Sequence, residues 1–222
     1  MEKVDNKEHL YYGLYAFAGF GLEILLGMLE SMIGIEKNLF FSCMHWSLTC
    51  VLWGTVAYLL VRNSDRKLGY AVLEDKKKPS KKNIAAVVFV MAVALIAKYI
   101  VIGGFKMIEE MAGLGVVQSV FQYIYYLFET ALIVLAVAFG QRFFENLTSC
   151  KVIPFGGIFL GCTWGLVHVL TQDFMTGIYA VVSAIVYGVI YVLLNKNIRW
   201  SYLLILILSV SYTHLTLPTI RL

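Results

Sequence analysis

Residues 115–139 read GVVQSVFQYIYYLFETALIVLAVAF and contain a single charged side chain, that of Glu129. A helix rises about 1.5 Å per residue and the hydrocarbon core of a bilayer is roughly 30 Å thick, so about 20 apolar residues can cross it. The stretch does not alternate between apolar and polar residues, as a barrel strand would. It therefore predicts a membrane-crossing helix, because backbone groups in lipid must find their hydrogen-bond partners within their own segment.

The composition of the whole chain agrees with this prediction. Of the 222 residues, 60% are hydrophobic and 14% are charged, whereas a soluble domain is about half apolar and about a quarter charged. The mean hydropathy is +0.78. Three prolines and the lack of a Ser/Gly-rich tract argue against disorder. Composition thus excludes a soluble enzyme and a nucleic-acid-binding domain, and it indicates a polytopic membrane protein.

Further apolar runs predict the other helices of the bundle. Six runs are long enough to span a membrane and a seventh is short; they cover 10–29, 39–61, 83–104, 115–139, 155–172, 174–194 and, the short one, 201–213. We expect an all-α, polytopic transmembrane helix bundle of about seven helices, formed by residues 1–210 as one domain. The first run is interpreted as a retained helix, since it contains Glu23 and no small-residue cleavage site follows it. Residues 211–222 change character abruptly and are expected to be a non-native tail that truncates the last helix.

The positive charges predict the orientation of these helices. With a cytoplasmic N-terminus, 14 of the 18 Lys and Arg residues fall on one side, against Lys37 and Lys106 on the other. The 14 are Lys3, Lys7, Arg62, Arg66, Lys67, Lys76, Lys77, Lys78, Lys81, Lys82, Arg142, Lys151, Lys196 and Arg199. We interpret the basic loop 62–82 as a topology determinant. The expected protein is a multi-pass component of a bacterial inner (plasma) membrane, in contact with lipid and with no nucleic-acid partner. Its four cysteines form no CxxC pair and are expected to be free thiols.

Four ionisable residues fall inside the predicted spans: Glu23, Lys98, Glu129 and His168. Each costs a few kcal/mol at the centre of a membrane helix, so these positions are where function is expected. Glu23 and Lys98 lie at similar depth and are interpreted as a structural ion pair. His45 lies near the outer end of its helix and is assigned no role.

Glu129 shares one helix face with three other polar side chains. Gln118, Gln122, Tyr125 and Glu129 follow at intervals of four, three and four residues, which places them on one side of the helix. Such a stripe must face the bundle interior or a water-filled cavity. Two interpretations stay open, a catalytic or proton-handling carboxylate and a hydrogen-bonding clamp between helices.

His168 lies on the same face as Gly157, Gly161 and Gly165, which repeat every four residues. Small residues at this interval let a neighbouring helix approach closely, so His168 should face another helix and act either in packing or as a ligand. Glu129 and His168 lie about 15 and 20 Å from the cytoplasmic ends of their helices. Adjacent antiparallel helices could therefore bring the carboxylate and the imidazole together.

A second polar stripe runs along the predicted helix 174–194. Thr176, Tyr179, Ser183 and Tyr187 recur at intervals of three and four residues. This stripe too is expected to face the bundle, where it would make ordinary hydrogen bonds between helices.

Over residues 115–210 the order of these features resembles the CAAX protease and bacteriocin-processing (CPBP) family of intramembrane proteases. The family pattern is Glu-Glu-xxx-Arg, then Phe-xxx-His on the next helix, then His-xxx-Asn or His-xxx-Asp on a late helix. Glu129 matches the first Glu, and Trp164-Gly-Leu-Val-His168 matches the second element 39 residues later. Thr130 and Val134 stand where the second Glu and the Arg belong, and Leu206 and Val210 stand at the third motif.

This resemblance implies either of two functions. The first is a catalytically degenerate member of the family that binds a membrane peptide or protein partner. The second is an active intramembrane metallopeptidase, a hydrolase in which Glu129 activates water and His168 binds the metal. Zinc or another divalent metal is implied only for this second case.

A third function follows from the ionisable residues themselves, without the resemblance. It is a small proton- or ion-coupled transporter in which Glu129, Lys98 and Glu23 relay protons.

Overall fold

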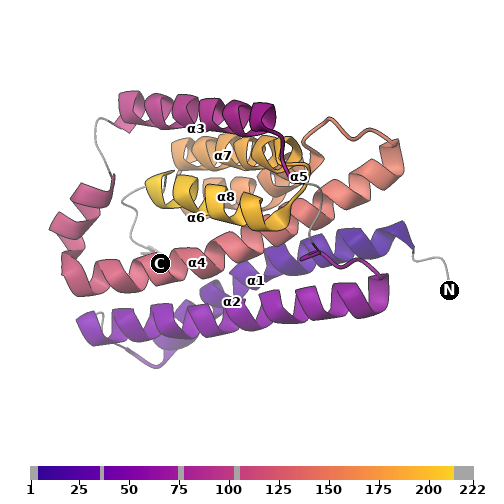
Figure 1. Cartoon of the computed structure of the whole chain (residues 1–222). Helices are drawn as coiled ribbons and strands as arrows, with labels where there is room; N and C mark the ends of the chain where they lie inside the picture. Colours follow the sequence, from indigo (N-terminus) through magenta and orange to yellow (C-terminus); the bar gives the residue numbers. More distant parts are fainter. Residues whose placement is uncertain (1–4, 36–37, 75–77, 103–105, 213–222) are drawn as a thin grey trace.

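The computed structural model describes residues 5–35, 38–74, 78–102 and 106–212, with the side chains of 98, 101–102, 106–114 and 212 outside the description. Over the described residues the regular structure is helical and forms seven helices, which confirms the predicted all-α bundle (Figure 1). They are α1 (Asn6–Met32), α2 (Leu39–Leu68), α3 (Lys81–Ile102), α4 (Lys106–Thr148), α7 (Phe174–Leu193), α8 (Ile198–Tyr212), and one helix made of α5 (Phe155–Leu160), the π-helical η1 (Gly161–Gly165) and α6 (Leu166–Thr171).

Four of these helices are long and apolar enough to cross a membrane. They are α1, α2, residues 115–148 of α4, and α7; the first three each contain a predicted span, and α7 ends one residue before the end of its predicted span 174–194. The helix 155–171 and residues 198–211 of α8 are shorter and also apolar. The predicted span 83–104 corresponds to α3, which has 22 residues. The protein is therefore an integral membrane protein by the length and composition of its helices.

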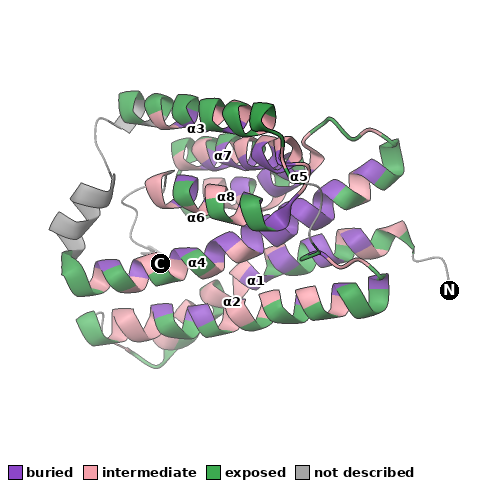
Figure 2. Ribbon diagram, in the orientation of Figure 1, coloured by how far each residue is buried: buried purple, intermediate pink, exposed green. Residues whose placement is uncertain are grey.

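Helix α4 is the central helix of the bundle. In an apolar 18-residue stretch of α4, 67% of the residues are buried, against 22% and 28% in the corresponding stretches of α1 and α2, whose outer faces carry large exposed apolar side chains. Buried residues gather along the second half of α4 and on α7, which packs beside it (Figure 2). Gly115, at φ 78° and ψ 165°, interrupts the helix and separates residues 106–114 from the long segment that follows. A positive φ of this kind suits glycine, which has no Cβ to clash.

The predicted close approach at the small-residue stripe is confirmed. A Cβ built on Gly157 would lie 2.6 Å from the carbonyl oxygen of Ala184, and one built on Gly188 would lie 2.5 Å from the Cα of Gly157. The helix 155–171 therefore packs directly on α7, with backbone against backbone.

Of the predicted polar stripe of α7, Ser183 and Tyr187 are buried and Thr176 and Tyr179 are half-buried. The Ser183 hydroxyl donates to the Tyr179 carbonyl of its own helix at 2.7 Å, whereas the sequence predicts a bond to another helix.

The bundle has two ends that the sequence already distinguishes. The basic end, near the N-terminus in Figure 1, comprises residues 69–74, 78–80, 149–154 and 194–197. Here Asn6 donates to the Phe143 carbonyl at 3.0 Å and Asn83 donates to the Leu193 carbonyl at 2.7 Å, so the helix ends are tied together. The opposite end comprises residues 33–35 and 38 together with the turn 172–173.

Candidate functional site

The functional residues gather near the opposite end, where α1, α2 and α4 meet. His45 of α2 stands between two carboxylates of α1, with Nδ1 at 2.8 Å from Glu30 Oε2 and Nε2 at 3.6 Å from Glu23 Oε1. From α4, the Tyr125 hydroxyl lies 3.1 and 3.0 Å from the two oxygens of Glu23, to which it donates. We call Glu23, Glu30, His45 and Tyr125 the carboxylate–imidazole cluster.

Ordinary helix geometry brings the cluster together. Glu23 and Glu30 are seven residues apart, which is close to two turns, so both face α2. The short connection between α1 and α2 makes the two helices antiparallel, and this places the early α2 residue His45 beside them. Trp53 fixes the spacing of the three helices, because its Nε1 donates to the Gly19 carbonyl at 2.9 Å and its ring packs 4.7 Å from that of Tyr125.

Two carboxyl groups and one imidazole make up the charged part of the cluster. The side chains of Glu23 and His45 are each 16% exposed and that of Glu30 is 20% exposed. Among the side chains that the structure describes, His45 is the one basic group that contacts either carboxyl group. An excess negative charge away from bulk water is costly, and a bound cation or proton would relieve it.

One oxygen of the cluster has no hydrogen-bond partner. Glu30 Oε1 is buried and is unbonded among the described residues, as are Thr49 Oγ1 on α2 and Thr130 Oγ1 on α4. Buried polar atoms in proteins are nearly always satisfied, so each of these exceptions calls for an explanation. Glu30 therefore has capacity for a further proton or water molecule.

The structure places Glu129 and His168 at the margins of this cluster. Glu129 is buried on α4, one turn after Tyr125, and interacts with it electrostatically. His168 is half-buried at the end of α6 and interacts electrostatically with Glu23. Each of the two predicted residues is thus connected to the cluster through Glu23 or Tyr125. Their joint catalytic role stays a prediction.

The local structure around His168 fixes its tautomer. Its Nδ1 lies 2.7 Å from the Trp164 carbonyl oxygen, and a carbonyl can only accept, so Nδ1 carries the hydrogen. Its ring centroid lies 4.4 Å from that of Trp164. The Trp164 ring in turn contacts Phe20, and Phe20 contacts Trp53. Nε2 is therefore the ring nitrogen that remains able to accept a proton.

His45 and Glu30 are members of the candidate site that the sequence pattern does not predict. Glu23 was paired with Lys98, whose side chain lies outside the described residues, whereas the structure gives Glu23 contacts with His45 and Tyr125. The signal was present, because in an antiparallel helix pair the residues nearest the turn face one another. Glu30 is the carboxylate nearest the turn on α1, and His45 is the first histidine after it on α2.

The predicted metal role of His168 finds no set of ligands in the structure. Among the described residues, no three His, Cys, Asp or Glu side chains come together as a metal site. In the carboxylate–imidazole cluster the His45 ring itself lies between the two carboxylates, so Glu23 and Glu30 do not converge on a common cation. The donor set of the cluster therefore does not fit a divalent metal.

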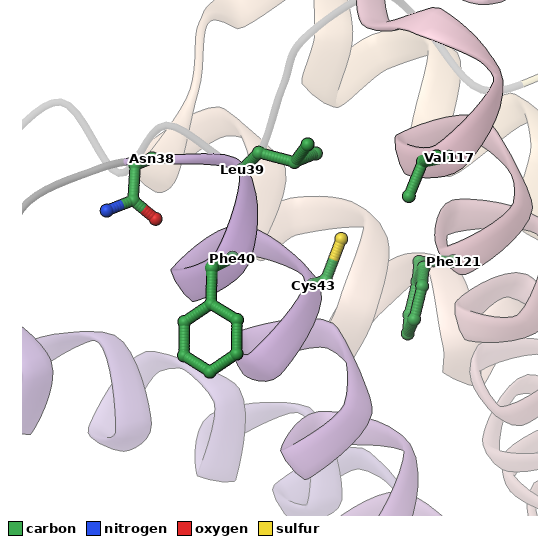
Figure 3. A pocket seen from close by; sticks show the side chains of 6 residues that line it. All are labelled: Asn38, Leu39, Phe40, Cys43, Val117 and Phe121. Carbon is green, nitrogen blue, oxygen red and sulfur yellow. The ribbon is translucent and has the colours of Figure 1, made fainter.

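A shallow pocket opens beside the cluster at the same end of the bundle. It lies between the start of α2 and residues 117–121 of α4, with Asn38, Leu39, Phe40, Cys43, Val117 and Phe121 as its lining (Figure 3). The thiol of Cys43 points toward the α4 side of this pocket. All four cysteines are free, as predicted.

No family model, curated protein or solved structure matches this chain. The CPBP resemblance therefore stays a prediction from the spacing of Glu129, Trp164 and His168, and the site is interpreted from its own geometry.

Proposed function

We propose that this integral membrane protein takes up and releases protons at the carboxylate–imidazole cluster, as a proton-coupled transporter requires. The observation that carries the proposal is the position of His45 between Glu23 and Glu30 inside the helix bundle. Histidine is the side chain whose ordinary titration lies nearest neutral pH, and flanking carboxylates stabilise its charged form.

The geometry suggests which atoms take part. His45 Nδ1 donates to Glu30 Oε2 at 2.8 Å, which leaves Nε2 to accept a proton. Once Nε2 is protonated, it faces Glu23 Oε1, and the added positive charge offsets the second carboxylate. Release of that proton restores the excess negative charge. Tyr125 donates to Glu23 in both states and holds its carboxylate in position.

The protonation state of His45 can be measured directly. We would record ¹⁵N-histidine NMR spectra of the purified protein in lipid nanodiscs over a pH series. The expected result is one imidazole that titrates in the wild type, disappears in His45→Gln, and titrates at a different pH in Glu23→Gln. His9→Gln is the matched control, since His9 packs against Tyr70 at the basic end. An imidazole of His45 that keeps one protonation state throughout the series would overturn the proposal.

A second candidate is the peptide-binding or peptidase function that the CPBP resemblance implies. One observation favours it: the π-helical turn Gly161–Gly165 precedes His168 and carries Trp164. Single π-helical turns within α-helices occur frequently at functional sites. Cleavage of a fluorogenic membrane peptide that is lost in both Glu129→Gln and His168→Gln, with the titration of His45 retained, would support this candidate. Wild-type protein without cleavage would exclude the peptidase.

The predicted membrane and orientation belong to the same proposal. Because the basic end holds most of the chain's Lys and Arg residues, we place it and the N-terminus in the cytoplasm of a bacterial cell. The carboxylate–imidazole cluster then lies toward the outer leaflet. An accessible thiol at Cys150, in the segment 149–154, is expected to react only with reagents that enter the cytoplasm.

A further inference from the structure

We infer that, with the helices arranged as they are here, the carboxylate–imidazole cluster exchanges protons with one side of the membrane only, the side of the opposite end, because an apolar segment of α4 seals it from the basic end. The inference rests on the proposed function and adds the route of the proton to it. It is carried by three consecutive layers of the bundle.

The first layer is a polar path from the opposite end. Glu30 lies two residues before the end of α1 at Met32, and its side chain is 20% exposed. From there the path continues to His45 and then to Glu23, which lies seven residues, or about 10 Å, deeper along α1. Each step joins one titratable group to the next. Glu30 Oε2 lies 2.8 Å from His45 Nδ1, and His45 Nε2 lies 3.6 Å from Glu23 Oε1.

The titratable groups that face this path come from four helices. They are Glu23 and Glu30 of α1, His45 and Cys50 of α2, Tyr125 and Glu129 of α4, and His168 of α6.

The second layer is an apolar barrier. Every residue from Leu132 to Phe139 is apolar, and none is more than 4% exposed. This segment is about 12 Å long. Its neighbours are apolar or aromatic: a Cβ on Gly19 would meet Leu132 at 2.9 Å, and the rings of Tyr12 and Phe139 lie 5.3 Å apart. Ordered water needs polar partners, so a well-packed apolar layer offers no route for protons.

The third layer is a polar network at the basic end that is already satisfied. Gln141 Nε2 donates to Glu145 Oε1 at 2.7 Å and to the Ile153 carbonyl at 2.9 Å, and Gln141 Oε1 accepts from the Gly156 amide at 2.8 Å. Lys196 forms an ion pair with Glu145. Within this network the positive charge of Lys196 neutralises the negative charge of Glu145, so the network does not require a further proton.

Sidedness can be tested on the full chain in liposomes. Impermeant maleimide labels Cys150 only where the basic end faces outward, which gives the fraction of each orientation. The Cys43→Ser, Cys50→Ala, Cys162→Ser background leaves Cys150 as the single thiol. The pH outside the vesicles is changed abruptly, and the protons that the vesicles take up are measured with an external pH indicator. The proton uptake of the cluster is defined as the part of this signal that is lost in Glu23→Gln.

The expected result is a proton uptake that rises in proportion to the fraction of protein with the opposite end outward. Uptake that follows the other orientation, or that is independent of orientation, overturns the sidedness and leaves the proposed function intact. If no part of the uptake depends on Glu23, the proposed function itself fails.

A second measurement locates the barrier. Glu30→Cys and Ala136→Cys, each in a background without the native cysteines, are treated with a small impermeant methanethiosulfonate reagent from either side. The Glu30 side chain is 20% exposed and Ala136 is fully buried, so we expect Cys at position 30 to react from the opposite end only and Cys at position 136 to react from neither side. Reaction at position 136 from the basic end would overturn the inference. Wild-type helicity by circular dichroism shows that each variant is folded.

Discussion

The two polar regions of this bundle differ in how completely their groups are satisfied. At the basic end, Gln141, Glu145, Gly156 and Lys196 form what we call the basic-end network, in which hydrogen bonds and an ion pair match donors to acceptors. In the carboxylate–imidazole cluster, two carboxylates share one imidazole, and Glu30 Oε1 is buried without a hydrogen-bond partner in the described structure.

This difference indicates different roles for the two regions. A satisfied buried network stabilises one arrangement of the chain and is costly to break. A cluster with unbonded acceptors stabilises the fold less, but those acceptors can bind a proton or a hydrogen-bond donor. We therefore expect substitutions in the basic-end network to lower stability with little change in proton exchange, and substitutions in the cluster to do the reverse.

The largest expected effect comes from Gly156→Val. A Cβ at position 156 would lie 2.2 Å from the Val137 carbonyl oxygen, so α5 must move away from α4 and the hydrogen bond from the Gly156 amide to Gln141 is strained. Overpacking against backbone costs at least about 3 kcal/mol here. Thermal unfolding in detergent measures it. Gly21→Ala is the control, because nothing lies within 4 Å of a Cβ there; an equal loss of stability in both variants would contradict the prediction.

The next effect comes from Lys196→Met, which leaves the buried carboxylate of Glu145 without its cation. The Glu145 side chain is 6% exposed and that of Lys196 is 21% exposed, so we expect a loss of about 3 kcal/mol of unfolding free energy. The double variant Lys196→Met, Glu145→Gln should recover most of it, since the charge is then absent. Stability that does not recover in the double variant would show that the loss does not come from the unpaired charge of Glu145.

Much of the fold could be predicted from the sequence, because lipid imposes a simple rule on the backbone. Each predicted span became a helix, and the spacing of Gly157, Gly161 and Gly165 correctly indicated close packing. The cluster could not be predicted in the same way. Its members come from three helices, and the partner of Glu23 depends on which helix packs beside α1. Depth pairs Glu23 with Lys98 and leaves His45 near the outer end of its helix, but depth alone does not say which residues are neighbours.

A substitution in the carboxylate–imidazole cluster should change proton exchange more than it changes stability. His45→Gln should change the free energy of unfolding by no more than about 1 kcal/mol, because Glu23 and Glu30 are 16% and 20% exposed, against 6% for Glu145, and the Gln amide can still donate to Glu30. The same substitution should abolish the Glu23-dependent proton uptake of the liposome experiment. A variant that loses several kcal/mol while keeping that uptake would assign the cluster to structure alone.

The smallest effect tests the boundary between the two regions on α4 itself. Thr130 and Val134 lie one helical turn apart, are both buried, and differ chiefly in a hydroxyl against a methyl group. Thr130 Oγ1 is buried without a hydrogen-bond partner among the described residues, so Thr130→Val removes an unsatisfied group and should leave stability unchanged or raise it by up to about 1 kcal/mol. Val134→Thr places a hydroxyl at the start of the apolar barrier and should cost about 1 kcal/mol.

The sign of each change is decisive, since the two substitutions are the reverse of one another. Equilibrium unfolding of both variants under identical detergent conditions measures it. If Thr130→Val is the destabilising member of the pair, the Thr130 hydroxyl has a partner, for example a bound water, and the polar region extends one turn further toward the basic end. The polar region would then reach to within two residues of the apolar barrier, and the segment Leu132–Phe139 alone would separate it from the basic-end network.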